Sequence, residues 1–255
     1  MLTNPIIEAM MNRKSIRKYK KKMPTNKIIE TIVRAGQQAP FASQLGSLLL
    51  TKNNPKAPFG APLSFIFLLD SYKLELIMKR RQWKMITNDL QMLIFGIQDL
   101  TLMGENMVMT AESLGLGSCY IGMTPYSAKY LARKHKLPKR VFPIVELVMG
   151  YPDEIRPPRP RYPLDAVLFE NEYPKFTDEM LDRAMKAMDD GYLAQDYYRN
   201  LKAKIKLAGD REETFNYDNY SWTEHISRKW GQWFESPDKL LEQFKQCGFN
   251  LKFEE

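Results

Sequence analysis

The order of hydrophobic and polar residues along the chain predicts a series of helices in its first half. Asn4 is a typical N-cap in front of Pro5, and the apolar residues that follow have the spacing of a helix face. A second helix is predicted at residues 26–38, behind the cap residue Thr25. Through residues 93–114 apolar side chains recur every three or four positions, which predicts the longest helix. Because this helix is apolar on more than one side, we expect it to lie between a sheet and a partner subunit.

Short apolar runs predict the strands. Residues 48–51, 65–70 and 144–149 are continuous hydrophobic segments of strand length, a pattern typical of strands that are covered on both faces. These runs should form the central sheet. A further strand-like segment lies at residues 166–169, after a proline-rich passage. Beyond Tyr173 the chain is charged and is predicted to be almost wholly helical.

Size and composition exclude several classes of protein. A chain of 255 residues with 44% hydrophobic content can bury a sizeable core, which excludes full disorder. The longest apolar runs are far shorter than the roughly 20 residues of a membrane-spanning helix, and no export signal is visible, so we expect a cytoplasmic protein. The cysteines and histidines, which are Cys119, Cys247, His135 and His225, predict neither a disulfide framework nor a metal site.

A basic segment after the first helix is the first candidate site. It combines cations with a hydroxyl group in Arg13, Lys14, Ser15 and Arg17. This combination suits a phosphate monoester and ribityl oxygens, because charge-assisted hydrogen bonds to phosphate are strong and directional. Taken alone, such a run is more often a solvated basic turn. The net charge of +8 favours anions near the surface, but it does not distinguish nucleic acid, membrane and phosphorylated cofactors.

The second candidate segment is the turn that follows the second predicted helix. Ala42, Ser43 and Gln44 offer a small side chain, backbone groups and an amide. These groups could meet the polar edge of a flat ligand, although an ordinary connection between a helix and a strand explains them as well.

The third candidate segment follows the long helix. Gly115 and Gly117 end that helix, and Gly122 permits a close approach of the backbone to a ligand. Backbone amides in this segment could donate hydrogen bonds to the N5 and O4 edge of an isoalloxazine ring, although a helix C-cap explains the first glycines equally well. We assign no chemistry to Cys119, because a buried, inert thiol is the more common role for such a cysteine.

The fourth candidate segment lies in the proline-rich passage. Arg159 and Arg161 alternate on an extended stretch that prolines stiffen, so their side chains are expected to point to one side. Such a pair could complete a phosphate site that Arg13 and Arg17 begin.

Taken in order, these segments resemble the nitroreductase family, and within it the branch that contains the major oxygen-insensitive nitroreductase and flavin reductase P. The resemblance covers the start of the chain through Tyr19, residues 111–122, residues 159–173 and residues 222–226. It implies an α+β fold with a central, mostly antiparallel sheet flanked by helices, in an intertwined homodimer with C-terminal strand exchange. It also implies an FMN-binding core at residues 1–173, with a swapped segment at about 162–173, and a helical C-terminal extension at residues 174–255.

The resemblance gives each candidate segment a role toward FMN. The first segment would hold the phosphate and ribityl chain, the second would approach the flavin from the other subunit, the third would border the reactive edge, and the fourth would bind the phosphate. The cofactor-binding residues implied are Arg13, Lys14, Ser15, Arg17, Ala42, Ser43, Gln44, Tyr120, Ile121, Gly122, Met123, Arg159 and Arg161. The chain departs from many members at Phe41 and Gln44, and its residues 202–211 are not a clear copy of the segment that favours NADPH.

The function implied is NAD(P)H-dependent, FMN-dependent reduction of a flat, electron-poor acceptor, such as a nitroaromatic, a quinone or a flavin, by ping-pong two-electron transfer. No catalytic side chain is implied, because the cofactor carries the chemistry. NADH and NADPH both remain possible donors. The alternatives are another flavin reaction, such as reductive dehalogenation or flavin destruction, and a basic protein that binds nucleic acid or another polyanion. The latter leaves the glycine and arginine segments unexplained, so we expect neither nucleic acid nor membrane as a partner.

Overall fold

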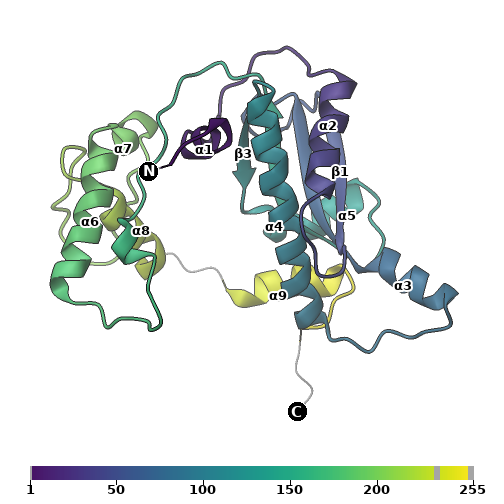
Figure 1. Ribbon diagram of the computed structural model, residues 1–255. Coiled ribbons are helices and arrows are strands. Elements are labelled where there is room, and N and C mark those ends of the chain that lie inside the picture. Colours follow the sequence, from purple (N-terminus) through teal and green to yellow (C-terminus); the bar gives the residue numbers. More distant parts are fainter. Residues whose placement is uncertain (1, 233–235, 252–255) are drawn as a thin grey trace. The chain divides into compact units, whose positions relative to one another are not determined.

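The chain forms two compact units in the computed structural model, which describes residues 2–232 and 236–251 (Figure 1). The first unit comprises Met1–Arg156 together with Ser236–Glu255, and the second comprises Pro157–Glu235. The boundary expected at residue 173 separates an FMN-binding core from a helical extension. It is not a boundary between compact units, and it stays a prediction. Residues 1, 233–235 and 252–255 of the two expected parts lie outside the described residues.

A single antiparallel sheet organises the described part of the first unit. Its strands are β1 (Gly46–Lys52), β2 (Leu63–Asp70), β3 (Gly117–Ile121) and β4 (Val141–Gly150), in the order β1-β2-β4-β3. The three strands predicted from apolar runs are confirmed, and β3 is an addition to them. The predicted cover on both faces holds for the central strand β2, which is buried almost throughout, but not for β1, which is only half-buried because it lies at an edge of the sheet.

The predicted helices of the first unit are confirmed. The side chain of Asn4 accepts hydrogen bonds from the N–H groups of Ile6 and Ile7 at the start of α1 (Pro5–Met11). The predicted second and longest helices are α2 (Asn26–Gln37), capped by Thr25, and α4 (Asp89–Ser113). The remaining helices of this unit in the described residues are α3 (Ser71–Arg80), α5 (Ala128–Lys134), α9 (Pro237–Gln246) and the short turns η1 (Pro58–Gly60) and η2 (Thr124–Ser127).

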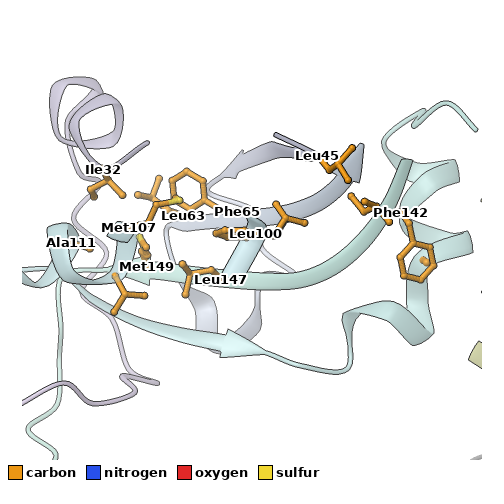
Figure 2. Packing of buried hydrophobic residues seen from close by; sticks show 14 of the residues in the cluster. Ile32, Leu45, Leu63, Phe65, Leu100, Met107, Ala111, Phe142, Leu147 and Met149 are labelled. Atoms are coloured by element: carbon orange, nitrogen blue, oxygen red, sulfur yellow. The ribbon is translucent and has the colours of Figure 1, made fainter. Parts of the chain in front are cut away.

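The main core lies between the sheet and the pair α2 and α4, while α5 packs on the opposite face (Figures 1 and 2). Phe65, Leu147 and Met107 are fully buried in this core. Phe244 of α9 stacks on Phe142 of β4 with ring centroids 4.0 Å apart, so the end of the chain closes one end of the first unit. The sheet is therefore a rigid support with a core on both faces.

The second unit is built from α6 (Asp178–Leu193), α7 (Tyr197–Leu201), α8 (Trp222–Gln232) and the short turn η3 (Leu164–Ala166). The strand expected at residues 166–169 is wrong. The N–H groups there turn back to the carbonyls of Pro163 and Leu164, so they are not available for a strand ladder. The expectation of an almost wholly helical tail is also wrong for residues 203–221, which form an irregular segment.

Candidate functional site

The first and third candidate segments meet at the edge of the sheet. Ser15 forms a parallel bridge with Ser118 of β3, and the N–H of Ile16 donates to the carbonyl of Ser118 at 2.9 Å. Gly117 makes this contact possible, since a Cβ there would lie 2.4 Å from the Ile16 side chain. The basic segment is thus added to the sheet next to the strand that leads to Ile121.

Glu154 fastens the basic segment to the turn after β4. Its carboxylate accepts the N–H groups of Arg17 at 2.5 Å and Lys18 at 3.1 Å, and it pairs with Arg156 at 2.8 Å. Burial alone would raise the pKa of Glu154, but these hydrogen bonds and the nearby cation together hold it below its usual range. With its backbone held in this way, the segment keeps its side chains available for a ligand.

The cationic side chains of the segment are only half-buried. Arg17 lies with its guanidinium carbon 5.9 Å from the ring centre of Phe59, and Arg13 and Lys14 lie beside Glu112 of α4. Burial raises the pKa of Glu112, and the two cations work against this shift. Three cations thus lie within one short segment at the surface of the first unit, as an anion site requires.

The third segment alternates between the two faces of the sheet. Tyr120 points to the core beneath α4, where its hydroxyl lies close to Gly104, and burial raises its pKa. Cys119 points the other way and is buried with Ala61 and Val148, as expected for an inert thiol. Gly122 follows the strand, and the space around the position of a Cβ there is open to 4 Å. The chain thus leaves room for a ligand directly after Ile121.

A cavity of about 280 Å³ opens beside this turn. Ile121 and Met123 contribute to its wall, and so do residues that the sequence did not single out: Thr51, Asn54, Lys56, Ser64, His135 and Glu146. The Ser64 hydroxyl donates to Glu146, whereas the buried Thr51 oxygen has no hydrogen-bond partner in the described part of the chain. The one sequence signal was Glu146 itself, a carboxylate inside the otherwise apolar run of β4.

Burial and the positive charge of Lys134 lower the pKa of His135 in this wall, while Glu146 opposes the shift. The neutral form of His135 is therefore favoured near neutral pH, and the charged groups of the wall are Glu146 with the lysines Lys56 and Lys134.

The second segment is held by a buried carboxylate that sequence reasoning missed. Asp99 of α4 accepts the N–H groups of Ala42 at 2.5 Å, Ser43 at 3.3 Å and Leu45 at 2.9 Å. Gln44 has a φ of 51°, a left-handed conformation that these bonds help to maintain. The acid within an apolar helix was the available signal, since a buried charge must have partners.

The fourth segment lies in the second unit. Arg159 donates to the Gln195 side chain at 2.6 Å, and its guanidinium carbon lies 3.9 Å from the ring centre of Tyr197. Arg161 donates to the backbone carbonyls of Arg159 and Pro160. The extended stretch is present without a strand ladder, and joint action of these arginines with the first segment stays a prediction.

The residues present in the first unit fit a flat, phosphorylated cofactor such as FMN. Arg13, Lys14 and Arg17 supply cations, Gly122 leaves room for a ring, and the buried Thr51 hydroxyl lacks a partner within the described residues. In residues 2–232 and 236–251, no helix is long and apolar enough to cross a membrane.

Known proteins that are similar to this chain include enzymes named as an FMN reductase and as a nitroreductase. The model of the nitroreductase family matches residues 49–151. An "NADPH-dependent oxidoreductase" of Staphylococcus saprophyticus is 28% identical, over 98% of this chain and 100% of that protein. An "FMN reductase (NADPH)" of Bacillus subtilis is 27% identical, over 97% of this chain and 99% of that protein. The solved structure of NfrA2 from B. megaterium superposes with a TM-score of 0.81 over 99% of this chain and 100% of its own, at 22% identity.

Proposed function

We propose that the chain is a member of the nitroreductase family and acts as an FMN-dependent oxidoreductase that uses NADH or NADPH to reduce flat, electron-poor acceptors such as nitroaromatics, quinones or flavins. Relatives that match almost the whole chain are named as an NADPH-dependent oxidoreductase and as an FMN reductase that uses NADPH. The observation that carries the proposal is the junction of the basic segment with β3, which brings Arg13–Arg17 next to the strand that ends at the open turn of Gly122.

The chain's own groups bind and orient rather than react. Arg13, Lys14 and Arg17 would hold the phosphate and ribityl chain of FMN, because guanidinium and ammonium groups donate charge-assisted hydrogen bonds. Backbone donors at Gly122 and Met123 would face the reactive edge of the ring and stabilise negative charge there. When bound, FMN supplies the two-electron chemistry. Asp99 would keep residues 42–44 in a fixed shape for the same task.

Arg159 and Arg161 of the second unit belong to this proposal as further phosphate ligands. Their support is the extended, proline-stiffened stretch and the contact of Arg159 with Gln195 and Tyr197, which orients its guanidinium group. The proposal assigns no side chain as an acid or base.

A homodimer belongs to the proposal as well. Leu90, Ile94 and Ile97 of α4 lie on one helix face and are 38%, 47% and 39% exposed, which is a large apolar stripe for a monomer. Burial of this stripe against a second copy would let residues 42–44 of one subunit approach the flavin of the other. Ile94→Glu should therefore convert a dimer to monomers in analytical ultracentrifugation, and bound FMN should be lost with it. The cytoplasmic location expected from the sequence is part of the same proposal.

The direct test is the absorption spectrum of the purified protein, followed in the same cuvette by anaerobic NADH or NADPH and then menadione. We expect flavin bands that bleach with a nicotinamide nucleotide and return with the quinone. A colourless protein that cannot be reconstituted with FMN would overturn the proposal.

Variants of the basic segment test the site itself. Arg17→Ala should weaken FMN binding by at least about tenfold, because it removes a charge-assisted hydrogen bond to phosphate. Lys21→Ala is the matched control, since it removes one cation from an exposed position in the same stretch of chain. Equal effects of the two substitutions in a fluorescence titration with FMN would contradict the assignment of Arg17.

A further inference from the structure

A single carboxylate interrupts the apolar strand β4. Glu146 lies between Val145 and Leu147, in a strand whose other side chains are hydrophobic apart from Gly150 at its end. A charge at such a position is unfavourable for folding unless it has partners, and departures of this kind from a fold's pattern concentrate at functional sites.

The register of the sheet places Glu146 beside the turn where the ligand is expected. Glu146 is the direct partner of Ile121, the last residue of β3, and directly paired residues of antiparallel strands point to the same face. On its other side it is paired with Ile66 of β2, and the Ser64 hydroxyl donates to its carboxylate. The carboxylate is therefore held in the wall of the cavity that Ile121 and Met123 also line.

The charges around Glu146 do not neutralise it by direct ion pairing in the described part of the chain. Lys56 and Lys134 line the same cavity, but the close partner of the carboxylate is the neutral hydroxyl of Ser64. His135, the remaining titratable group in the wall besides Tyr130, is favoured in its neutral form by burial and by Lys134, which lower its pKa. The wall of the cavity thus carries a negative charge at Glu146 and positive charges at Lys56 and Lys134.

We propose that Glu146 sets the reduction potential of the flavin bound at this cavity, by placing a negative charge near a ring that gains electron density on reduction. This inference rests on the proposed function. A nearby negative charge disfavours the electron-rich reduced ring, so it lowers the potential and makes the bound cofactor a stronger reductant. Lys56 and Lys134 act in the opposite direction, and the balance among the three groups adjusts the cofactor to its acceptors.

The test is the midpoint potential of FMN bound to the full-length protein, measured by spectroscopic titration in wild type and in Glu146→Gln. Glutamine has nearly the same shape and can still accept from Ser64, so the substitution removes mainly the charge. We expect a more positive potential, equivalent to at least about a tenfold change in the ratio of reduced to oxidised FMN, or about 30 mV for a two-electron couple. Glu30→Gln is the matched control, because it makes the same change of net charge at an exposed position on α2.

An unchanged or more negative potential in Glu146→Gln, or a shift equal to that of Glu30→Gln, would overturn the inference while the proposed function stands. A wild-type protein that binds no FMN would overturn both.

A second variant tests the inference even where Glu146→Gln no longer binds FMN. Ser127 is exposed in the wall of the same cavity, at the N-cap position of α5, where aspartate is well tolerated. Ser127→Asp adds a negative charge there and should lower the potential. A shift in the positive direction, or none, would contradict control of the potential by charge in this cavity.

Discussion

Different forces stabilise the interior of each of the two units. In the first unit the largest buried side chains are hydrophobic, with Phe65, Leu147 and Met107 fully enclosed between the sheet and two helices. In the second unit a buried ion-pair network lies among aromatic and apolar side chains: Tyr198, Tyr220 and Met188 are buried, and the Arg228 side chain is only 2% exposed and pairs with Glu213 and Glu224. Hydrophobic burial needs no directed partner and depends little on pH, whereas a buried cation depends on every group that compensates it.

The difference follows from the backbone that each unit must stabilise. The irregular residues 203–221 cannot form a hydrophobic stripe of regular period, so direct bonds fix them. Arg228 donates to the carbonyl of Ile205, and the N–H of Ile205 donates to the Tyr220 hydroxyl, which also lies 3.0 Å from a ring nitrogen of His225. The comparison teaches that the sheet serves as a fixed support, while the second unit depends on its network for its shape.

Phe65→Ala should produce the largest effect on stability. The substitution leaves a cavity in the centre of the first unit and should lower the free energy of unfolding by about 3–5 kcal/mol. Denaturant unfolding followed by tryptophan fluorescence and circular dichroism measures this loss. A change below about 1 kcal/mol would mean that the core is far more adaptable than its packing indicates.

Arg228→Met should act mainly on the second unit. It leaves Glu224 and the Ile205 carbonyl without their partner, so amide hydrogens in residues 203–221 should exchange about tenfold faster or more. Amide hydrogens of β2 should keep their exchange rates, and Arg183→Met, which removes an exposed arginine of the same unit, is the control. Faster exchange in β2 as well would show that the two units unfold together.

Glu154→Gln should make a smaller, pH-dependent change in the first unit. The pKa of Glu154 in the folded chain is held below the ordinary value of 4.5, so its contribution to stability is present at neutral pH and is lost as the pH falls below that value. We expect the variant to be less stable by about 1–2 kcal/mol at pH 7, with a difference that shrinks as the pH falls through the lowered pKa. Urea unfolding at pH 7 and at pH 4 and below measures it, and a difference that grows on acidification would contradict the assigned role.

Tyr220→Phe should have the smallest effect of the series. It removes the hydroxyl that accepts from Ile205 but keeps the buried ring, so the loss should be about 1 kcal/mol and confined to the second unit. Hydrogen exchange of residues 203–221 again measures it. An effect as large as that of Arg228→Met would show that the aromatic hydroxyl, rather than the cation, organises this segment.

The sequence was a good guide where the chain's own periodicity decides the structure. The caps Asn4 and Thr25, the long helix α4 and the strands β1, β2 and β4 follow from residues that lie close together in the chain. It also identified Arg13–Arg17 and Tyr120–Met123 as candidate segments, because phosphate binding and close backbone approach need particular residue types. Residues 166–169 show its limit, since their composition suits a strand and their local hydrogen bonds form a turn.

The tertiary structure decided which distant residues act together. Asp99 holds residues 42–45 from another element, Glu154 fastens a segment more than a hundred positions away, and Glu146 becomes the neighbour of Ile121 only through the register of β3 and β4. No local pattern encodes such pairings, because hydrogen bonds and charges act through space. The sequence by itself therefore determined α1, α2, α4 and the strands β1, β2 and β4, and it predicted the kinds of ligand that the chain would hold, whereas the packing of the sheet determined which side chains surround the cavity.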